Sequence, residues 1–217
     1  MRILQRIKWN YRELFWFFNY RLRRKFLIST LVFVLISLCI PVVMKHLSNT
    51  DLYHQAASIA TPVSGKANEA LKEMLGYDWM GLWVHNVVAA LLSIIGGVIP
   101  FIYVGFIALI ENAFVLGYQV GVTESMMNYD LSLLWVVSVF PHGVLEYFIH
   151  ILVYTFSISF CSVSTRWYLR RDNLLDAKLY HVMAVKGLIF VVIPGLFICS
   201  LLEFYVTPFL IWKFLLH

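Results

Sequence analysis

Three ionisable side chains could carry chemistry in this sequence, because His142, Glu146 and His150 recur at intervals of four residues. They follow Pro141 in the segment that begins PHGVLE. On a helix, a spacing of four places all three side chains on one face. Imidazole and carboxylate groups gathered on one face can bind a proton, coordinate a metal ion or form a buried hydrogen-bond network.

This spacing differs from that of a zinc-protease motif. In HExxH the two histidines are four residues apart and the glutamate directly follows the first, whereas His142 and His150 are eight residues apart. A zinc site would need further ligands, for which His85 and Glu111 are candidates. We therefore predict a packed polar cluster with no metal or cofactor, and keep a metal site on His142, Glu146 and His150 as the alternative.

Four other polar residues interrupt apolar stretches, and we expect all of them to be buried: Asn86, Glu111, Asn112 and Glu203. A carboxyl group at the centre of a membrane helix costs about 3 kcal/mol on insertion scales. Glu111 therefore marks either a functional site or a polar lock between helices. Asparagine both donates and accepts hydrogen bonds, so we interpret Asn86 and Asn112 as structural contacts between helices.

The elements that must hold these side chains are membrane helices. Of the 217 residues, 61% are hydrophobic and only 13% are Asp, Glu, Lys or Arg, about half the roughly 25% of a soluble domain. A soluble domain of this size has too much surface to hide so many apolar side chains. The composition therefore predicts a single all-α membrane domain over residues 26–217, with lipid covering much of its surface.

Five apolar segments are long enough to cross a bilayer, which takes about 20 helical residues. They are residues 26–44, 80–99, 101–122, 131–163 and 183–202. The fourth is too long for one crossing, and Pro141 and Gly143 predict a broken or re-entrant helix within it. The fold predicted is thus a polytopic helix bundle.

The segments between and after the crossings have their own signals. Residues 45–78 form the longest polar stretch, and the apolar pattern at residues 68–75 predicts a short helix on the membrane surface. Residues 123–130 predict a short acidic loop, and the apolar tail after residue 202 is predicted to lie along the membrane. Three glycines on the third segment predict close helix packing: Gly105, Gly117 and Gly121.

The first 25 residues form a basic arm with aromatic side chains among the charges. Its eight Lys and Arg residues are accompanied by a single acid, Glu13. Trp9, Phe15 and Trp16 lie among them, as in an amphipathic helix at the membrane interface. We predict that this arm binds anionic lipid headgroups and not nucleic acid.

Charge also predicts the orientation of the chain in the membrane. Residues 1–25 and 164–182 are the basic segments, and basic segments remain in the cytoplasm. Five crossings satisfy this rule with a cytoplasmic N-terminus and an external C-terminus.

Four pieces of the sequence resemble a known family in the order in which they occur. PHGVLE resembles the PHGxxE signature of the stage II sporulation protein M family. HNVVAALLSIIGG, ENAFVLG and PGLFICSLLEFYVTP resemble further family segments, with matches at Asn86 and Gly96, Asn112 and Gly117, and Pro194, Glu203, Thr207 and Pro208. The resemblance covers about residues 80–210 and leaves out the basic arm, Glu111 and His150.

The resemblance implies a polytopic protein of the bacterial plasma membrane without an assigned catalytic activity. Its signature residues here are Pro141, His142, Gly143 and Glu146. In endospore formers the named member holds a peptidoglycan-degrading complex at the septum during engulfment. Other relatives accompany circular-bacteriocin gene clusters, where they are linked to maturation, export or immunity, often beside an ABC-type ATPase.

Three functions stay open at this point. The sequence has no nucleophile elbow, Walker loop or dinucleotide fingerprint, so we favour a non-enzymatic, oligomeric scaffold or assembly subunit with other membrane or envelope proteins as partners. The second hypothesis is an exporter or transporter subunit, in which Glu111, His142 and Glu146 form a proton or substrate site and an ABC-type ATPase docks on residues 166–178. The third is an intramembrane metal-dependent hydrolase built on His142 and Glu146.

Overall fold

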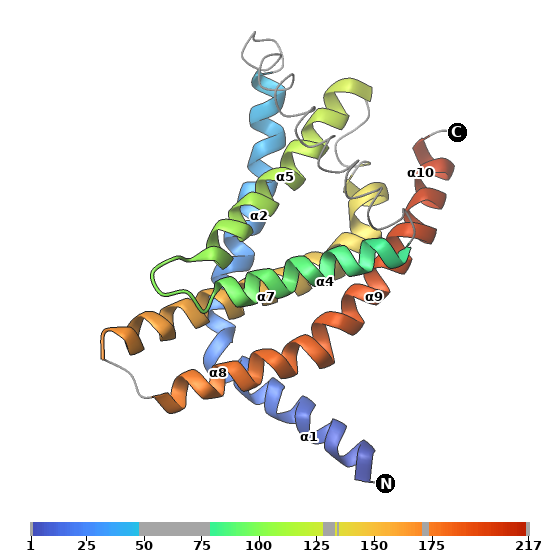
Figure 1. Cartoon of the computed structure of the whole chain (residues 1–217). Helices are drawn as coiled ribbons and strands as arrows, with labels where there is room; N and C mark the ends of the chain where they lie inside the picture. Colours follow the sequence, from blue (N-terminus) through green and yellow to red (C-terminus); the bar gives the residue numbers. More distant parts are fainter. Residues whose placement is uncertain (1, 48–78, 128–132, 134, 171–173, 216–217) are drawn as a thin grey trace.

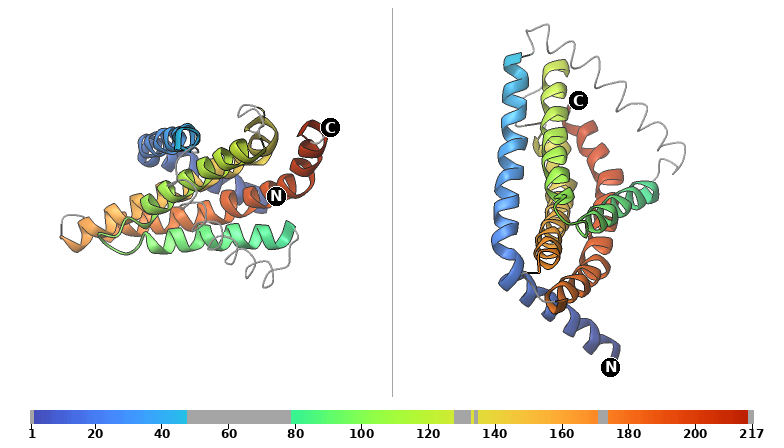
Figure 2. Two further views of the ribbon diagram at one scale, coloured as in Figure 1. Left: turned by 90° about the horizontal axis from the view of Figure 1, so that it is seen from above. Right: turned by 60° about the vertical axis from the view of Figure 1, so that its left-hand side comes forward.

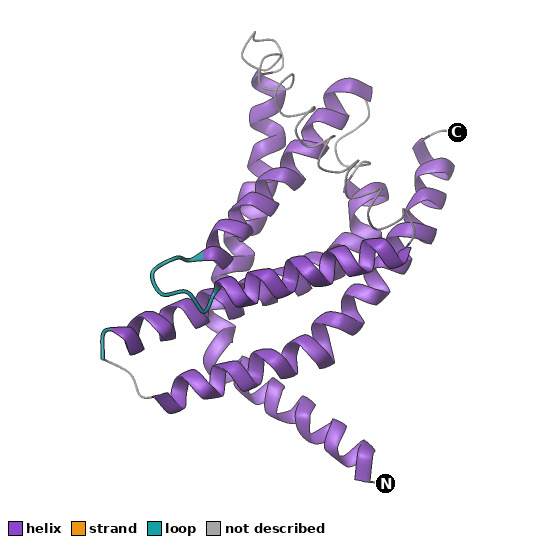
Figure 3. Cartoon of the chain, in the orientation of Figure 1, coloured by secondary structure: helices purple, strands orange, loops and turns teal. Residues whose placement is uncertain are grey.

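A computed structural model of the chain describes residues 2–47, 79–127, 133, 135–170 and 174–215. Every regular element among them is a helix, which confirms the all-α prediction (Figure 3). The surface helix predicted at residues 68–75 lies outside the described residues. The segment predicted as an acidic loop is partly helical, because a helix that begins at Val104 continues to Met127.

The helices group into five segments that are long and apolar enough to cross a membrane, as predicted. The first three are α1 (Arg2–Phe17), η1 (Phe18–Leu22) and α2 (Arg23–Leu47); α4 (Trp79–Gly96); and α5 (Val104–Met127). The last two are η2 (Trp135–Val139) with α7 (Phe140–Tyr168), and the run α8 (Leu174–Gly187), η3 (Leu188–Val192), α9 (Ile193–Leu201), η4 (Leu202–Val206) and α10 (Thr207–Leu215). The elements labelled η are single π-helical turns.

The segments alternate in direction along the bundle. In Figure 1, α2, α5 and the run α8–α10 point toward the end of the bundle where the C-terminus lies, and α4 and α7 run the opposite way. The N-terminus lies at the other end (Figure 1). In Figure 2, α2 and α5 lie side by side over their lengths and point the same way. This alternation is what five successive crossings require.

Helix α7 is the centre of the bundle. About 67% of its most apolar stretch is buried inside the protein, against 17–39% for the other four segments. It contacts α2, α4, α5, α8 and α9, and its residues from Ile149 to Cys161 are buried almost without a break. The remaining segments therefore have one protein-facing side and one outward, apolar side, as expected where lipid replaces water.

Two glycines allow α5 to approach its neighbours closely, as the small-residue pattern predicts. A Cβ atom on Gly105 would lie 2.5 Å from the Cβ of Ser157 on α7. A Cβ atom on Gly117 would lie 2.8 Å from the Ser37 carbonyl oxygen on α2. Real Cβ atoms do not come this close, so only glycine permits these helix separations.

Three prolines in the second half of the chain directly follow π-helical turns. Pro141, Pro194 and Pro208 are the second residues of α7, α9 and α10, and η2, η3 and η4 precede them. Proline has no N–H for the carbonyl four residues earlier, and its ring clashes with an uninterrupted α-helix. The wider π turns take up this mismatch. The chain therefore stays helical across Pro141, and the fifth segment continues to Leu215 where the sequence predicts a tail along the membrane.

The basic arm α1 bends away from α2 at η1 and lies against the start of the fifth segment (Figures 1 and 2). A π-helical turn is a usual place for such a bend. Phe17, at the end of α1, is fully buried. Its ring centroid lies 5.0 Å from that of Tyr180 and 6.1 Å from that of Phe156, so the base of the arm is part of the core.

Polar contacts fix the arm further along its length. The Tyr11 hydroxyl donates a 2.8 Å hydrogen bond to the carbonyl oxygen of Phe190. That carbonyl lies four residues before Pro194, which has no N–H to donate to it. Glu13 pairs with Lys186 of α8. The arm is thus a built-in element of the bundle.

Candidate functional site

Three ionisable side chains from distant parts of the sequence meet between α7 and the fifth segment. His142 and Glu146 lie in the first two turns of α7, and Glu203 lies in η4. One ring nitrogen of His142 and one carboxylate oxygen of each glutamate lie within 4.8 Å of one another. All three residues are half-buried. We refer to them as the His–Glu–Glu cluster.

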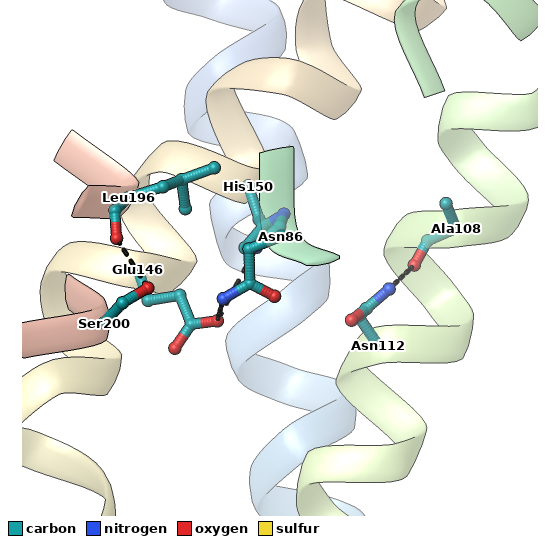
Figure 4. A network of polar contacts seen from close by, with 7 residues as sticks. All are labelled: Asn86, Ala108, Asn112, Glu146, His150, Leu196 and Ser200. Atoms are coloured by element: carbon teal, nitrogen blue, oxygen red, sulfur yellow. Dashed lines mark hydrogen bonds and ion pairs between the residues drawn. The ribbon is translucent and has the colours of Figure 1, made fainter. Parts of the chain in front are cut away.

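Helix α4 and the next turn of α7 hold the Glu146 carboxylate. The Asn86 amide nitrogen donates a 3.0 Å hydrogen bond to Oε1 of Glu146 (Figure 4). The His150 Nε2 atom lies 3.7 Å from the same oxygen. Asn86 and His150 are both buried. These contacts engage Oε1 and leave Oε2 of Glu146 for another partner.

The orientation of the His142 ring follows from its contact with Thr207. The His142 Nδ1 and Thr207 Oγ1 atoms are 2.9 Å apart. The Thr207 hydroxyl donates to the Leu202 carbonyl oxygen at 3.5 Å, within the turn that η4 forms. A hydroxyl has one proton to donate, so a Thr207 hydroxyl that donates to Leu202 accepts the Nδ1–H of His142. In that tautomer the lone pair of the imidazole is on Nε2.

Other candidates from the sequence do not join the cluster. Glu111 is exposed on the surface of α5, so the expectation that it is buried is wrong for the isolated chain. His85 is exposed on α4. The Asn112 amide donates to the carbonyl of Ala108 in its own helix at 2.9 Å, apart from Glu146 (Figure 4). A side chain can satisfy itself in this way four residues back along a helix, and Asn112 therefore need not join two helices.

Pro141 and Gly143 of the signature segment have structural roles. Pro141 lies in the first turn of α7, where a missing N–H costs least. Gly143 is buried, and a Cβ atom there would lie 3.0 Å from Val139 and 3.1 Å from the Tyr147 ring. It lines an apolar pocket of about 480 Å³ together with residues of α2 and α7. The glycine thus serves apolar packing, while His142 and Glu146 contribute to the polar cluster.

Comparison with known families agrees with this arrangement. The family model described as stage II sporulation protein M matches residues 26–208, which include the whole His–Glu–Glu cluster. The chain belongs to the stage II sporulation protein M family. Comparisons with curated proteins and with solved structures gave no match. The arm α1 precedes the matched residues.

The pieces that carry the family resemblance supply the cluster and its supports. Five polar residues of these pieces come together in space: Asn86, His142, Glu146, Glu203 and Thr207. Asn112 belongs to a resembling piece and lies apart. Sequence reasoning missed that Glu203 and Thr207 face α7. The only signal in the sequence that these two residues belong with the PHGVLE segment was that all the pieces resemble one family in the same order.

The cluster can bind a positive charge. Two carboxylates this close, away from bulk water, repel each other unless a proton or a cation lies between them. Among the described residues, no Lys or Arg forms an ion pair with Glu146 or Glu203. The positive charge can come from a protonated His142 or His150, from protons on the carboxylates or from a metal ion.

Proposed function

We propose that this member of the stage II sporulation protein M family is a non-enzymatic scaffold or assembly subunit of a cell-envelope complex. It is a multi-pass membrane protein by its five membrane-length helical segments. Its basic segments favour the bacterial plasma membrane with the N-terminus in the cytoplasm. The observation that carries the proposal is the arm α1, which is fixed to the bundle and presents basic and aromatic side chains outward.

The outward face of the arm has the chemistry of an interaction surface. Four aromatic side chains of α1 and η1 are 52–73% exposed: Trp9, Phe15, Trp16 and Tyr20. Arg6, Lys8 and Arg12 are exposed on the same arm. Aromatic and Arg side chains are enriched in protein interfaces, and the same combination binds anionic headgroups. An arm that the bundle holds in place can position a partner at the inner membrane surface.

Site-specific photo-crosslinking in native membranes tests this proposal. A photoreactive phenylalanine analogue is placed at Trp16 on the arm or, as a control, at Leu92 on the outward face of α4, where 62% of the residue is exposed. We expect a discrete protein adduct from position 16 and only lipid adducts from position 92. The triple substitution Arg6→Glu, Lys8→Glu and Arg12→Glu should reduce the adduct at position 16.

Two results would count against a scaffold. The first is a set of position 16 adducts that contains lipid alone. The second is a protein adduct that the triple charge reversal leaves unchanged, because the basic face would then have no role in recruiting the partner.

The cluster favours a second candidate, a membrane subunit of an exporter or transporter that works with an ABC-type ATPase. Carboxylates at a π-helical interruption resemble the broken-helix sites of transporters. Proton uptake driven by a membrane potential in proteoliposomes tests proton coupling. Uptake that is lost in Glu146→Gln and Glu203→Gln, and kept in Glu111→Gln, would support transport. Equal uptake in all three variants and in empty liposomes would exclude it.

A further inference from the structure

The His–Glu–Glu cluster has the donor set of a metal site. Zinc takes His nitrogen at about 2.0–2.1 Å and carboxylate oxygen at about 2.0–2.2 Å, which places neighbouring ligand atoms about 3.3 Å apart in a tetrahedron. The three donor atoms already lie within 4.8 Å of one another. Coordination would bring these atoms to about 3.3 Å from one another through rotation of the Glu146 and Glu203 side chains.

The histidine is already oriented as a ligand. Its Nδ1 lies 2.9 Å from the Thr207 hydroxyl oxygen, which lies 3.5 Å from the Leu202 carbonyl oxygen. In metal sites, a ligating His usually donates its other ring N–H to an oxygen, which fixes the tautomer and the ring. With the proton on Nδ1, the Nε2 atom of His142 carries the lone pair that a metal needs.

Charge also favours an ion over an empty cluster. Two ionised carboxylates and one divalent cation sum to zero, and a neutral group is far cheaper away from water than a pair of like charges. The Asn86 amide supports Glu146 from outside the cluster. This hydrogen bond leaves the second oxygen of Glu146 to face an ion.

His150 lies beside Glu146 and has one ring nitrogen without a partner among the described residues. It is only 7% exposed, and its Nε2 faces Glu146 at 3.7 Å. Its Nδ1 atom is buried without a hydrogen-bond partner among the described residues. A buried polar atom without a partner is uncommon and calls for an explanation such as an ion or ordered water nearby.

We propose that His142, Glu146 and Glu203 bind one divalent transition-metal ion, with zinc best suited to the site, and that Asn86 and Thr207 orient the ligands. One imidazole and two carboxylates suit zinc better than calcium or magnesium, which prefer oxygen ligands alone. Glu203 supplies the third ligand in place of His150, which belonged to the alternative set that the sequence offered. This proposal does not rest on the scaffold proposal, and it assigns to a metal ion the same Glu146 and Glu203 carboxylates that the transport candidate uses for protons.

The test is the metal content and zinc affinity of the full chain, purified in detergent without chelator. We expect about one zinc per chain, and a loss of zinc affinity of at least a hundredfold in His142→Asn and Glu203→Gln. Thr207→Val should weaken binding about 10–100-fold and Thr207→Ser far less, because the hydroxyl orients the ligand. Glu111→Gln is the matched control, since it removes a membrane glutamate outside the cluster.

Thermal unfolding separates loss of metal from loss of fold. Added zinc alone should raise the Tm of chelator-treated wild type and of Glu111→Gln, and leave that of Glu203→Gln unchanged. The proposal is overturned if wild-type chain neither contains metal nor gains Tm with zinc. It is also overturned if His142→Asn binds zinc as tightly as wild type. Manganese or iron in place of zinc, lost in the same variants, would keep the site and overturn the zinc assignment.

Discussion

Asn86 and Asn112 are the same residue type in two membrane helices, but their amides bond in different ways. The Asn86 amide reaches another helix and holds Glu146. The Asn112 amide bonds the carbonyl of Ala108 within its own helix. A hydrogen bond between helices is broken when the helices separate, and a bond within one helix is not. The two side chains should therefore differ in their contribution to stability.

This contrast gives a prediction at the scale of one residue. Asn86→Ala should lower the free energy of unfolding in detergent micelles by about 1 kcal/mol, in the range of interhelical hydrogen bonds in membranes. Asn112→Ala should change it by less than about 0.5 kcal/mol. Denaturant unfolding followed by circular dichroism measures both. Equal losses in the two variants would contradict the assignment of Asn86 to an interhelical contact.

At the scale of elements, the rigidity of neighbouring atoms decides how closely helices pack. A Cβ atom on Gly105 would meet Ser157 Cβ at 2.5 Å and the Tyr154 backbone oxygen at 2.8 Å, neither of which can move without α7. A Cβ atom on Gly195 would meet Ile149 Cδ1 at 2.4 Å, which is the end of a flexible side chain. Although the contact at Gly195 is the shorter one, a Cβ atom there should destabilise the bundle less than a Cβ atom at Gly105.

The two glycines provide a matched test of this argument. Gly105→Ala should destabilise the bundle by about 1–3 kcal/mol, because α5 and α7 must separate. Gly195→Ala should cost less, because Ile149 can change rotamer. Thermal unfolding of the two variants in the same detergent measures the difference. A larger loss for Gly195→Ala would show that α9 and α7 are the more rigid pair.

The position of the arm α1 depends on the hydrogen bond from Tyr11 to the Phe190 carbonyl oxygen, to which Pro194 has no N–H to donate. Tyr11→Phe keeps the ring contact with Phe190, whose centroid lies 5.8 Å away, and removes only the hydroxyl. The Phe190 carbonyl then loses its donor, at a cost of about 1 kcal/mol. We expect faster hydrogen exchange in α1 and no change in α7. Tyr20→Phe is the control, because Tyr20 is 73% exposed, and similar exchange in both variants would contradict the anchoring role.

At the scale of the whole molecule, the alternating directions of five segments predict that the two termini lie on opposite sides of the membrane. The basic arm and the end of α7 at Tyr168 lie at one end, and α10 ends at the other (Figure 1). The positive-inside rule assigns the basic end to the cytoplasm. The His–Glu–Glu cluster lies near the start of α10, so this orientation predicts that it is in the outer half of the membrane.

Cysteine labelling checks this topology. The native cysteines are first replaced: Cys39→Ser, Cys161→Ala and Cys199→Ala. In that background an impermeant maleimide should label Phe214→Cys in intact cells, and Leu169→Cys only after the membrane is opened. Both positions are exposed, so a difference between them reports the side of the membrane. Labelling of Leu169→Cys in intact cells would reverse the orientation.

The sequence by itself determined the membrane class, the all-helical fold and the five membrane-length segments. These properties depend on the length and apolarity of each segment, which are local and need no knowledge of neighbours. The family could be recognised for the same reason, since its signature residues are close together within each piece. The glycines that allow close packing could also be predicted, because a small residue lets helices approach closely whichever helix is the partner.

Only the tertiary structure decided which polar residues meet. The spacing of His142 and Glu146 placed them on one face, but not which helix that face would contact. The π turn η4 brings Glu203 and Thr207 to that face, and no periodicity in the sequence predicts where a π turn forms. Glu111 looked equivalent in the sequence and remains outside, because the packing of α5 turns it to the surface. Contacts between helices depend on rotation and tilt, which packing of the whole bundle sets.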